Sequence, residues 1–314
     1  MFKSNRLLTL CAQTSVHAGS GNDMGGVIDL PIQREKHTGF PKFESSSLKG
    51  SLRAEVRNAD AENYLDMEHS QIVNYTFGPE GDTNTAASMA VTDARCLLFP
   101  VKSVKGVFAW VTCPMVIKRF ISDLSIIGIE CNCAIPQEGT VSTNSMLTPD
   151  NAVIMLDENV YNIKPDESVN DFAKYILPMF SENATLLQEQ LETNIAVLSD
   201  DDFKMIVMMG TEVLFRNKIN PKTGTVEKGA LFQEEMLPSE TVLYALLMTG
   251  PIYDKPENKG AIAKAVAKSG CTEDEFIMNF LTSKIPAVIQ LGGGATLGKG
   301  LLATKIFDRS EIQS

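Results

Sequence analysis

The chain has 314 residues, of which 44% are apolar, which is enough for one large domain or two ordinary ones. It has no apolar stretch long enough to span a membrane, and its N-terminus lacks the apolar core of a secretory signal, so a cytoplasmic protein without a membrane partner is expected. The net charge of -11 argues against a protein that coats nucleic acid non-specifically, because such binding needs many Lys and Arg contacts. A local basic groove remains compatible with that charge.

Six cysteines are scattered among apolar neighbours, with no Cys-x2-Cys pair and too few per residue for a disulfide scaffold. They are expected to be reduced residues of the core. Cys131 and Cys133 form the one close pair. A one-residue gap is typical of alternation along a strand, so core filling is favoured for this pair over a metal site.

The first predicted element is a strand over residues 5–16, where apolar and polar residues alternate. A long loop follows, which begins with the small-residue run from His17 to Gly21 and continues to Pro41. Its glycines and isolated charges exclude a regular element. Because loops of this length usually have a function, this loop is the first candidate site.

A helix is expected to begin near Leu48, with the hydroxyls of residues 45–47 as N-terminal caps. Its apolar stripe comprises Leu48, Leu52, Val56 and Leu65. Residues 88–99 and 106–117 predict two strands of a hairpin, joined by a short connection that contains Pro100.

Residues 118–165 are punctuated by Gly, Pro and Asn, which predicts short strands and loops. Helical periodicity returns over residues 170–198, with a break near Pro178, and turn residues at 220–225 predict an extended hairpin over 213–238. The remaining expected elements are a strand at 241–249, helices at 257–268 and 273–281, and strands at 287–290 and 301–306. This order fits an α+β sheet domain of ferredoxin-like type with large insertions.

Three segments, taken together, resemble the RAMP superfamily of CRISPR proteins. They are residues 17–53, which contain Ile28-Asp-Leu-Pro-Ile-Gln-Arg-Glu35; residues 229–238, Gly-Ala-Leu-Phe-Gln-Glu-Glu-Met-Leu-Pro; and residues 291–300, Leu-Gly-Gly-Gly-Ala-Thr-Leu-Gly-Lys-Gly. The first phrase is most similar to the backbone subunit of the type III-B Cmr effector complex. Residues 118–210 carry no matching phrase.

The resemblance implies a single RAMP domain over residues 1–314 with a ferredoxin-like (RRM-like) core. Insertions are expected at about 17–44 (a catalytic loop), 118–165 (irregular) and 213–238 (a thumb β-hairpin). The resemblance also implies a ribonucleoprotein of antiviral defence, in which copies of the chain and other Cmr subunits form a helical filament along a CRISPR RNA. As an endoribonuclease, the assembly would cut complementary single-stranded target RNA.

RNA can be cut by its own 2′-hydroxyl, so a protein need only hold the scissile link in line, move a proton and stabilise phosphate charge. A carboxylate can do this as a base or by holding a divalent cation. Asp29 is the only charged residue between positions 25 and 33. Its match to the family's Asp-Leu-Pro phrase makes it the cutting residue by resemblance, with Mg2+ or Mn2+ as the expected cofactor. Without the resemblance, capping of a turn is the ordinary interpretation of a loop aspartate.

Four further residues are candidates for the same site. His17 could supply a general acid, a phosphate contact or a supporting hydrogen bond, and a purely structural hydrogen bond is equally compatible with its position. Glu227, Glu234 and Glu235 flank the Gly-Ala-Leu-Phe segment at the base of the expected thumb. One of them could face the cleavage site, although most glutamates on a hairpin are merely solvated.

The start of the helix is a candidate site for a guide-RNA phosphate. Ser46, Ser47, Lys49, Gly50 and Arg53 would offer free amides, hydroxyls and cations there. Capping alone explains the serines. The two cations oppose the helix dipole unless an anion is present, which favours a bound phosphate.

The C-terminal glycine-rich segment is a second candidate site for RNA phosphate. Gly292, Gly293 and Gly294 allow close approach of the backbone to a ligand, and Lys299 adds a cation. Lys299 is not followed by Ser or Thr and a strand rather than a helix comes next, so nucleotide hydrolysis is disfavoured. A glycine-rich turn between two core strands is the alternative.

The thumb adds Lys218 and Lys222, which could follow the RNA backbone, with Ile219 or Met236 as a wedge between bases. Ordinary packing is the alternative for both apolar residues. Two other functions are less compatible with the sequence. A non-catalytic guide-RNA scaffold of the same superfamily is disfavoured by Asp29 in the matched phrase, and an enzyme that processes CRISPR transcripts alone is disfavoured by the long loop and the thumb.

Overall fold

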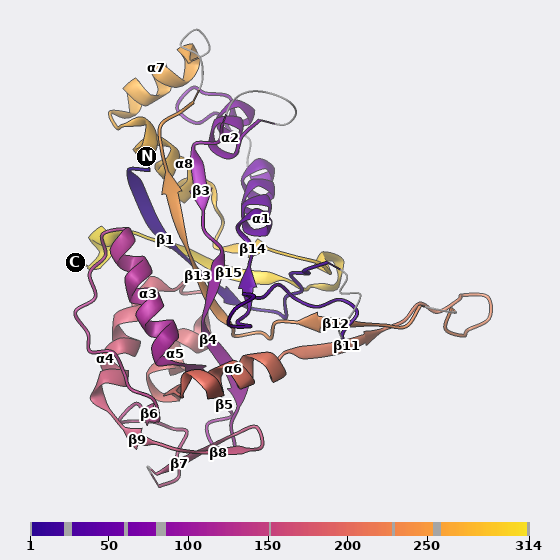
Figure 1. Ribbon diagram of the computed structural model, residues 1–314. Coiled ribbons are helices and arrows are strands. Elements are labelled where there is room, and N and C mark those ends of the chain that lie inside the picture. The colour runs from indigo at the N-terminus through magenta and orange to yellow at the C-terminus, as the bar shows by residue number, and fades with distance from the viewer. Residues whose placement is uncertain are drawn as a thin grey trace.

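The computed structural model describes residues 2–21, 27–59, 62–79, 86–150, 152–227, 230–253 and 259–312. Over these residues the chain forms one large mixed sheet of 11 strands and two small two-stranded sheets. Figure 1 shows the large sheet running through the body of the molecule, with helices packed around it, and a long hairpin that projects away from the body. The hairpin is therefore set apart from the core.

The large sheet contains a continuous path of nine strands with two short strands beside it. In spatial order the path is β14 (Val288–Gln290), β15 (Leu301–Phe307), β1 (Ser4–Ala12), β13 (Val242–Thr249), β4 (Ala94–Lys102), β5 (Phe108–Thr112), β10 (Ile195–Val197), β6 (Thr140–Val141) and β9 (Lys164–Pro165). Beside it, β2 (Lys42–Phe43) pairs with β4 and β3 (Met89–Val91) pairs with β13. The small sheets are β7 (Val153–Leu156) with β8 (Asn159–Asn162) and β11 (Glu212–Arg216) with β12 (Phe232–Met236).

Strand β1 lies inside the large sheet, where Leu8 faces Ala245 of β13 on one side and Ile306 of β15 on the other. Burial on both faces explains why its sequence reads as an almost continuous apolar run. Thr9 interrupts that run and is 1% exposed, and its hydroxyl donates to the carbonyl of Met179 at 2.7 Å. The polar group is thus satisfied inside the core.

Eight α-helices are described, and they gather toward the two ends of the large sheet (Figure 1). Toward one end lie α1 (Ser45–Asn58), α2 (His69–Phe77), α7 (Gly260–Ser269) and α8 (Glu273–Lys284). Toward the other end lie α3 (Pro114–Ile126), α4 (Glu167–Ile176), α5 (Thr185–Asn194) and α6 (Asp200–Met209). None of these helices combines the length and the apolar character that crossing a bilayer requires.

The mixed architecture confirms the predicted α+β fold class. The predicted strand at 241–249 and the β4–β5 hairpin are present, and Ile219 bridges to Val226 around the predicted turn of the thumb. The predicted break near Pro178 is the short 3-10 helix η1 (Leu177–Met179). Gly25, Gly26 and Gly229 of the matched phrases lie outside the described residues, as does the start of the predicted helix at 257–268. The assignment of residues 1–314 to a single domain with insertions stays a prediction.

Several local predictions are wrong. Pro100 lies inside β4 rather than in a connection, and the strand predicted over 106–117 ends at Thr112 because Pro114 opens α3. Proline suits the first turn of a helix, where its missing N–H is not needed. Cys131 and Cys133 belong to no strand, although all six cysteines are free thiols as expected.

The predicted α1 is also displaced. The helix begins at Ser45, and Glu44 rather than a serine is the residue before it. Leu48, Leu52 and Val56 are its buried stripe as predicted, whereas Leu65 lies beyond its end in a turn with a φ of 50°. Helices α2 and α6 were not predicted.

Candidate active site and RNA-binding surface

The segment that carries Asp29 is docked on the thumb strand β12. The Asp29 carboxylate accepts a hydrogen bond from the backbone N–H of Gln233 at 2.8 Å. The N–H of Leu30 donates to the Gln233 carbonyl at 3.0 Å, and the N–H of Glu235 donates to the Leu30 carbonyl at 3.0 Å. These residues of the predicted loop therefore extend the thumb sheet by a parallel bridge between Leu30 and Glu234. Asp29 nevertheless remains exposed.

His17 is anchored to the same strand. Its Nδ1 lies 2.7 Å from the Glu235 carbonyl oxygen, which can only accept, so Nδ1 carries the proton and the neutral ring has its lone pair on Nε2. Asp29 and His17 are thus attached to β12 at positions 233 and 235. Alternate residues of a strand are about 7 Å apart, so the structure brings these two predicted residues into one neighbourhood.

Glu235 is the most heavily bonded carboxylate of this site and is only 3% exposed. It accepts hydrogen bonds from Arg34 Nη2 at 2.5 Å, Thr211 Oγ1 at 2.7 Å and the Ile32 N–H at 2.9 Å. Burial by itself raises the pKa of this carboxyl, but the bonds from Arg34, Ile32 and Thr211 and the Arg34 charge outweigh burial, so the pKa lies below its usual value. Glu235 is consequently an ionised structural anchor, which corrects its candidacy as a group open to substrate.

The other two thumb glutamates occupy different places. Glu234 is 9% exposed and accepts a bond from Arg216 Nε at 2.7 Å. Glu227 pairs with Lys218 at 2.9 Å, beyond the end of the two-stranded sheet and next to the turn. The prediction that Glu227 lies at the thumb base is therefore wrong, because the hairpin register places it opposite Lys218 toward the tip.

At the start of α1 an anion is already supplied by the chain itself. Asp93 accepts the Ser45 N–H at 2.8 Å and pairs with Lys42 at 2.8 Å. Burial raises the pKa of Asp93, but the bonds from Lys42 and Ser45 lower it more. The Ser47 hydroxyl accepts a bond from Gln33 Nε2 at 3.0 Å. The predicted serine caps are thus wrong, and Asp93 already accepts the first of the helix amides that were expected to be free, that of Ser45.

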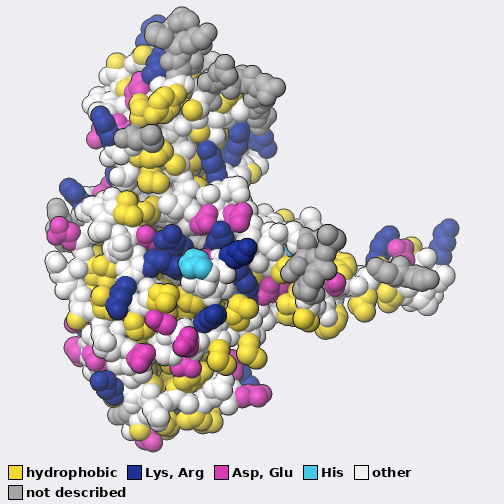
Figure 2. Space-filling model, viewed as in Figure 1, with side chains coloured by type: hydrophobic (Ala, Val, Ile, Leu, Met, Phe, Trp, Pro, Cys, Tyr) yellow, Lys and Arg dark blue, Asp and Glu magenta, His cyan; other side chains and the backbone are white. Residues whose placement is uncertain are grey.

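The cations of α1 do share a face. Lys49 and Arg53 are separated by one turn, and burial together with the Arg53 charge lowers the pKa of Lys49. Ser46 and Gly50 are exposed beside them. Figure 2 shows dark-blue side chains over α1. They lie on the side that faces the space between the thumb and the end of the molecule that carries α1, α2, α7 and α8. This surface fits a polyanion.

The glycine-rich loop packs against the backbone of the chain at His17. A Cβ at Gly292, whose φ is +86°, would lie 2.2 Å from the His17 carbonyl oxygen, and the N–H of Gly293 donates to that oxygen at 2.9 Å. Lys299 Nζ donates to the Ser15 hydroxyl at 3.1 Å. The close approach that the glycines permit is therefore made at least partly to residues 15–18. Residues 295–298 at the tip of the loop remain exposed.

The thumb residues that were predicted to contact RNA differ in exposure. Ile219 is 57% exposed and Lys218 and Lys222 are exposed near the turn. Met236 is 0% exposed and therefore cannot be a wedge between bases, which corrects that prediction. Its place in the core follows from its position at the root of β12, beside the body of the molecule.

Residues 9–303 match the RAMP superfamily. The chain belongs to this superfamily. It is 35% identical over 301 residues to the CRISPR system Cmr endoribonuclease Cmr4 of Pyrococcus furiosus. The alignment covers 94% of this chain and 93% of that protein. It is 23% identical over 320 residues to the CRISPR system CMR subunit Cmr4 of Saccharolobus solfataricus, with 93% and 92% covered.

Solved structures agree. The crystal structure of oligomeric Cmr4 from Pyrococcus furiosus superposes with a TM-score of 0.68 and 28% identity, covering 96% of this chain and 97% of that one. A chain in the cryo-EM structure of the type III-B Cmr-beta complex bound to cognate target RNA reaches a TM-score of 0.69 at 17% identity, covering 99% of each chain. That second likeness shows a common fold.

Sequence reasoning missed the residues that hold this RAMP site together. Gln33 is 8% exposed and joins two segments, donating to Gly19 on one side and, at the start of α1, donating to Ser47 and accepting from the Glu44 N–H. Arg34 bonds Glu235. Both lie in the matched Gln-Arg-Glu phrase, and two consecutive polar residues inside a matched loop phrase were the signal that could have found them.

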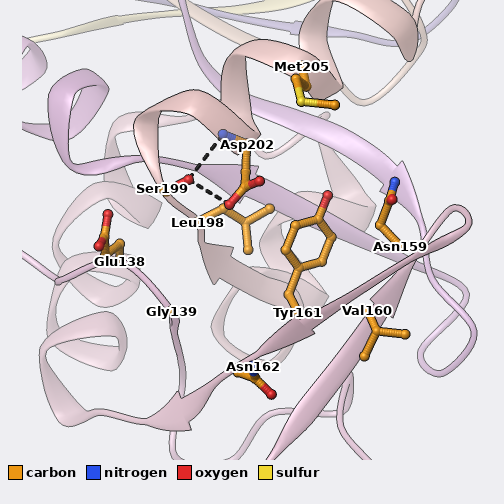
Figure 3. Close-up of a pocket in the computed structure, with 10 residues that line it drawn as sticks. All are labelled: Glu138, Gly139, Asn159, Val160, Tyr161, Asn162, Leu198, Ser199, Asp202 and Met205. Atoms are coloured by element: carbon orange, nitrogen blue, oxygen red, sulfur yellow. Dashed lines mark hydrogen bonds between the residues drawn. The ribbon is translucent and has the colours of Figure 1, made fainter.

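The described residues hold no cluster of three or more His, Cys, Asp or Glu that could ligate a metal ion. A cavity of about 550 Å³ lies elsewhere, between β8 and α6 (Figure 3). Tyr161, Asn159 and Asp202 line it, and the Ser199 hydroxyl donates to Asp202. None of its lining residues belongs to the Asp29 segment or the thumb, so it is separate from the site described above.

Proposed function

We propose that this chain is the CRISPR RNA-binding backbone subunit of a type III-B effector complex and an endoribonuclease that cleaves complementary target RNA. The observation that carries the proposal is the exposed Asp29 carboxylate, fixed at the base of a projecting hairpin and close to His17. Support also comes from the 35% identity to a protein named Cmr endoribonuclease over nearly the whole chain. Its partners would be guide RNA, target RNA, further copies of itself and other Cmr subunits.

In this proposal the target's 2′-oxygen attacks the adjacent phosphorus as its proton is removed, the bond to the 5′-oxygen breaks, and that oxygen leaves with a proton, which gives a 2′,3′-cyclic phosphate and a 5′-hydroxyl. The Gln233 N–H holds one oxygen of Asp29, which leaves the other free to accept a proton or to face phosphate. Because the Nδ1 proton of His17 is committed to the Glu235 carbonyl, Nε2 is the atom that would exchange a proton with the RNA. Gly19 lies against it: a Cβ there would come within 2.9 Å of Nε2.

A single exposed carboxylate fits Mg2+ or Mn2+, because Mg2+ keeps several waters and is commonly held by one or two carboxylates together with substrate phosphate. When bound, the ion would neutralise charge on the phosphate. Asp29 would be its protein ligand. The absence of a larger ligand cluster among the described residues is consistent with that donor set.

Guide-RNA contacts are proposed for the surfaces that flank this site. Lys49 and Arg53, with Ser46, Ser47 and Gly50 beside them, would bind phosphate from α1. Lys299 and the backbone of Gly292, Gly293 and Gly294 would add contacts from the C-terminal loop. Lys218 and Lys222 would reach the RNA from the thumb, with Ile219 against a base.

The test is Asp29→Ala in the assembled complex with guide RNA and labelled complementary target. We expect target cleavage in Mg2+ or Mn2+ to fall by about 100-fold or more, the scale of a lost acid–base group, while target binding is retained. Asp201→Ala, an exposed aspartate on α6, is the matched control and should cleave normally. Unchanged cleavage by Asp29→Ala would remove the catalytic assignment, and binding without cleavage by the wild-type complex would favour a scaffold.

A further inference from the structure

Arg34 joins three parts of the molecule. Its Nη1 donates to the carbonyls of Gly39 and Val207, each at 2.9 Å, and its Nη2 donates to Glu235 at 2.5 Å. The contacts lie in its own loop, in α6 and in the thumb strand β12. The side chain is 17% exposed, so the ion pair is largely withdrawn from solvent.

On the other side of the pair, Glu235 contacts three of the groups that shape the proposed active site, while the Asp29 carboxylate is held by the neighbouring Gln233. Its carboxylate binds the Ile32 N–H, its own N–H binds the Leu30 carbonyl, and its carbonyl receives Nδ1 of His17. The neighbouring Thr211 at the root of β11 donates to the same carboxylate. Asp29 binds Gln233 and His17 binds Glu235, so their relative position depends on this short stretch of β12, and Arg34 holds the charged end of Glu235.

We propose that Arg34 is a positioning residue for RNA cleavage, which clamps the Asp29 segment to the thumb base through Glu235 so that thumb and loop act as one rigid unit. The inference rests on the proposed function. An arginine is required because its planar fork serves Glu235, Gly39 and Val207 at once, whereas a lysine offers a single point charge. Removing either partner leaves a buried charge without compensation and frees the segment to shift.

A displacement of about 1 Å in a reacting group can lower a rate by about 100-fold. Arg34 acts on Asp29 through Glu235 and β12, so loss of the clamp should slow the chemical step and spare RNA binding. A neighbouring ion pair provides a matched comparison: Glu35 binds Arg119 of α3 at 2.8 Å, with side chains 8% and 20% exposed. That pair resembles the clamp in burial, and its hydrogen bonds join the loop to α3 rather than to β12.

The experiment compares complexes carrying wild-type chain, Arg34→Met, Arg34→Lys, Glu235→Gln, the Arg34→Met/Glu235→Gln double variant and Arg119→Met. Guide binding, target Kd and single-turnover cleavage at saturating target are measured, together with amide hydrogen exchange over residues 29–35 and 233–235. We expect Arg34→Met and Glu235→Gln each to slow cleavage about 10- to 100-fold at unchanged Kd. The double variant should be little slower than either single one, because the two residues act together.

Faster amide exchange at Ile32 and Gln233 should accompany the slower cleavage, and Arg119→Met should show neither change. If Arg34→Met does not fold, Arg34→Lys decides by the same two readouts. Wild-type cleavage by a folded Arg34 variant, or an equal loss in Arg119→Met, would overturn the clamp. Asp29→Ala separates the two proposals: if it abolishes cleavage while Arg34 variants cleave normally, only the clamp fails, and if it cleaves normally, the proposed function fails.

Discussion

The base and the tip of the thumb contain the same kinds of residue in opposite circumstances. At the base, Glu235 is 3% exposed and Arg34 is 17% exposed in its side chain, and the pair is surrounded by further hydrogen bonds. Near the tip, Glu227 pairs with Lys218, whose side chain is 72% exposed. A buried, multiply bonded pair fixes geometry, whereas an exposed pair contributes little stability and its charges remain available to a ligand.

The largest difference between the base and the tip of the thumb is expected when one apolar side chain is truncated at each of them. Met236 at the base is 0% exposed and Ile219 near the tip is 57% exposed. We expect Met236→Ala to lower the free energy of unfolding by about 2–5 kcal/mol, the usual range for a truncated core residue. Ile219→Ala should change it by less than about 0.5 kcal/mol. Urea denaturation measures both, and equal effects would contradict the division.

Acid provides the next test. The pKa of Glu235 is lowered in the folded state, so its contribution to stability is present above the pKa of the unfolded chain and is lost as the pH falls through the folded pKa. We expect Glu235→Gln to remove that part of the acid dependence, giving a flatter fall in melting temperature below about pH 4.5. Glu35→Gln should flatten it similarly, since the pKa of Glu35 is also lowered. An acid profile unchanged in Glu235→Gln would contradict the ionised anchor.

The smallest effect on stability is expected at the tip. Lys218→Ala/Lys222→Ala should leave the melting temperature within about a degree, because exposed charges rarely matter by more than about 0.5 kcal/mol. If these lysines meet phosphate, RNA affinity should fall and the slope of log affinity against log salt should decrease by about 1 for each lost contact. Titrations at several salt concentrations measure this. Unchanged affinity and slope would confine RNA to the body of the protein.

Turn residues and glycines predicted correctly the elements that depend on residues close together in the sequence. The turn residues at 220–225 specified the thumb, and the glycines at 292–294 specified a tight loop between β14 and β15. Asp29 could be selected only because its loop phrase matched a family. Its chemistry alone did not distinguish it from the other acidic residues.

Contacts between distant residues explain what could not be predicted. At the start of α1 the Ser45 amide is bound by Asp93, which lies 48 residues later in the chain. The role of Glu235 depends on Arg34, 201 residues earlier, and no periodicity reports such a pair. The missed α3 is different, because Pro114 after a strand was a local signal for a helix start that the apolar run obscured.

The glycine at position 292 should tolerate almost no substitution. Its missing side chain makes room for the His17 carbonyl, so even an alanine there would collide with the backbone beside the proposed active site. A random screen for inactive variants should therefore recover substitutions at Gly292 among the strongest, although the residue carries no reactive group. Such variants would identify the contact between the glycine-rich loop and the segment around His17.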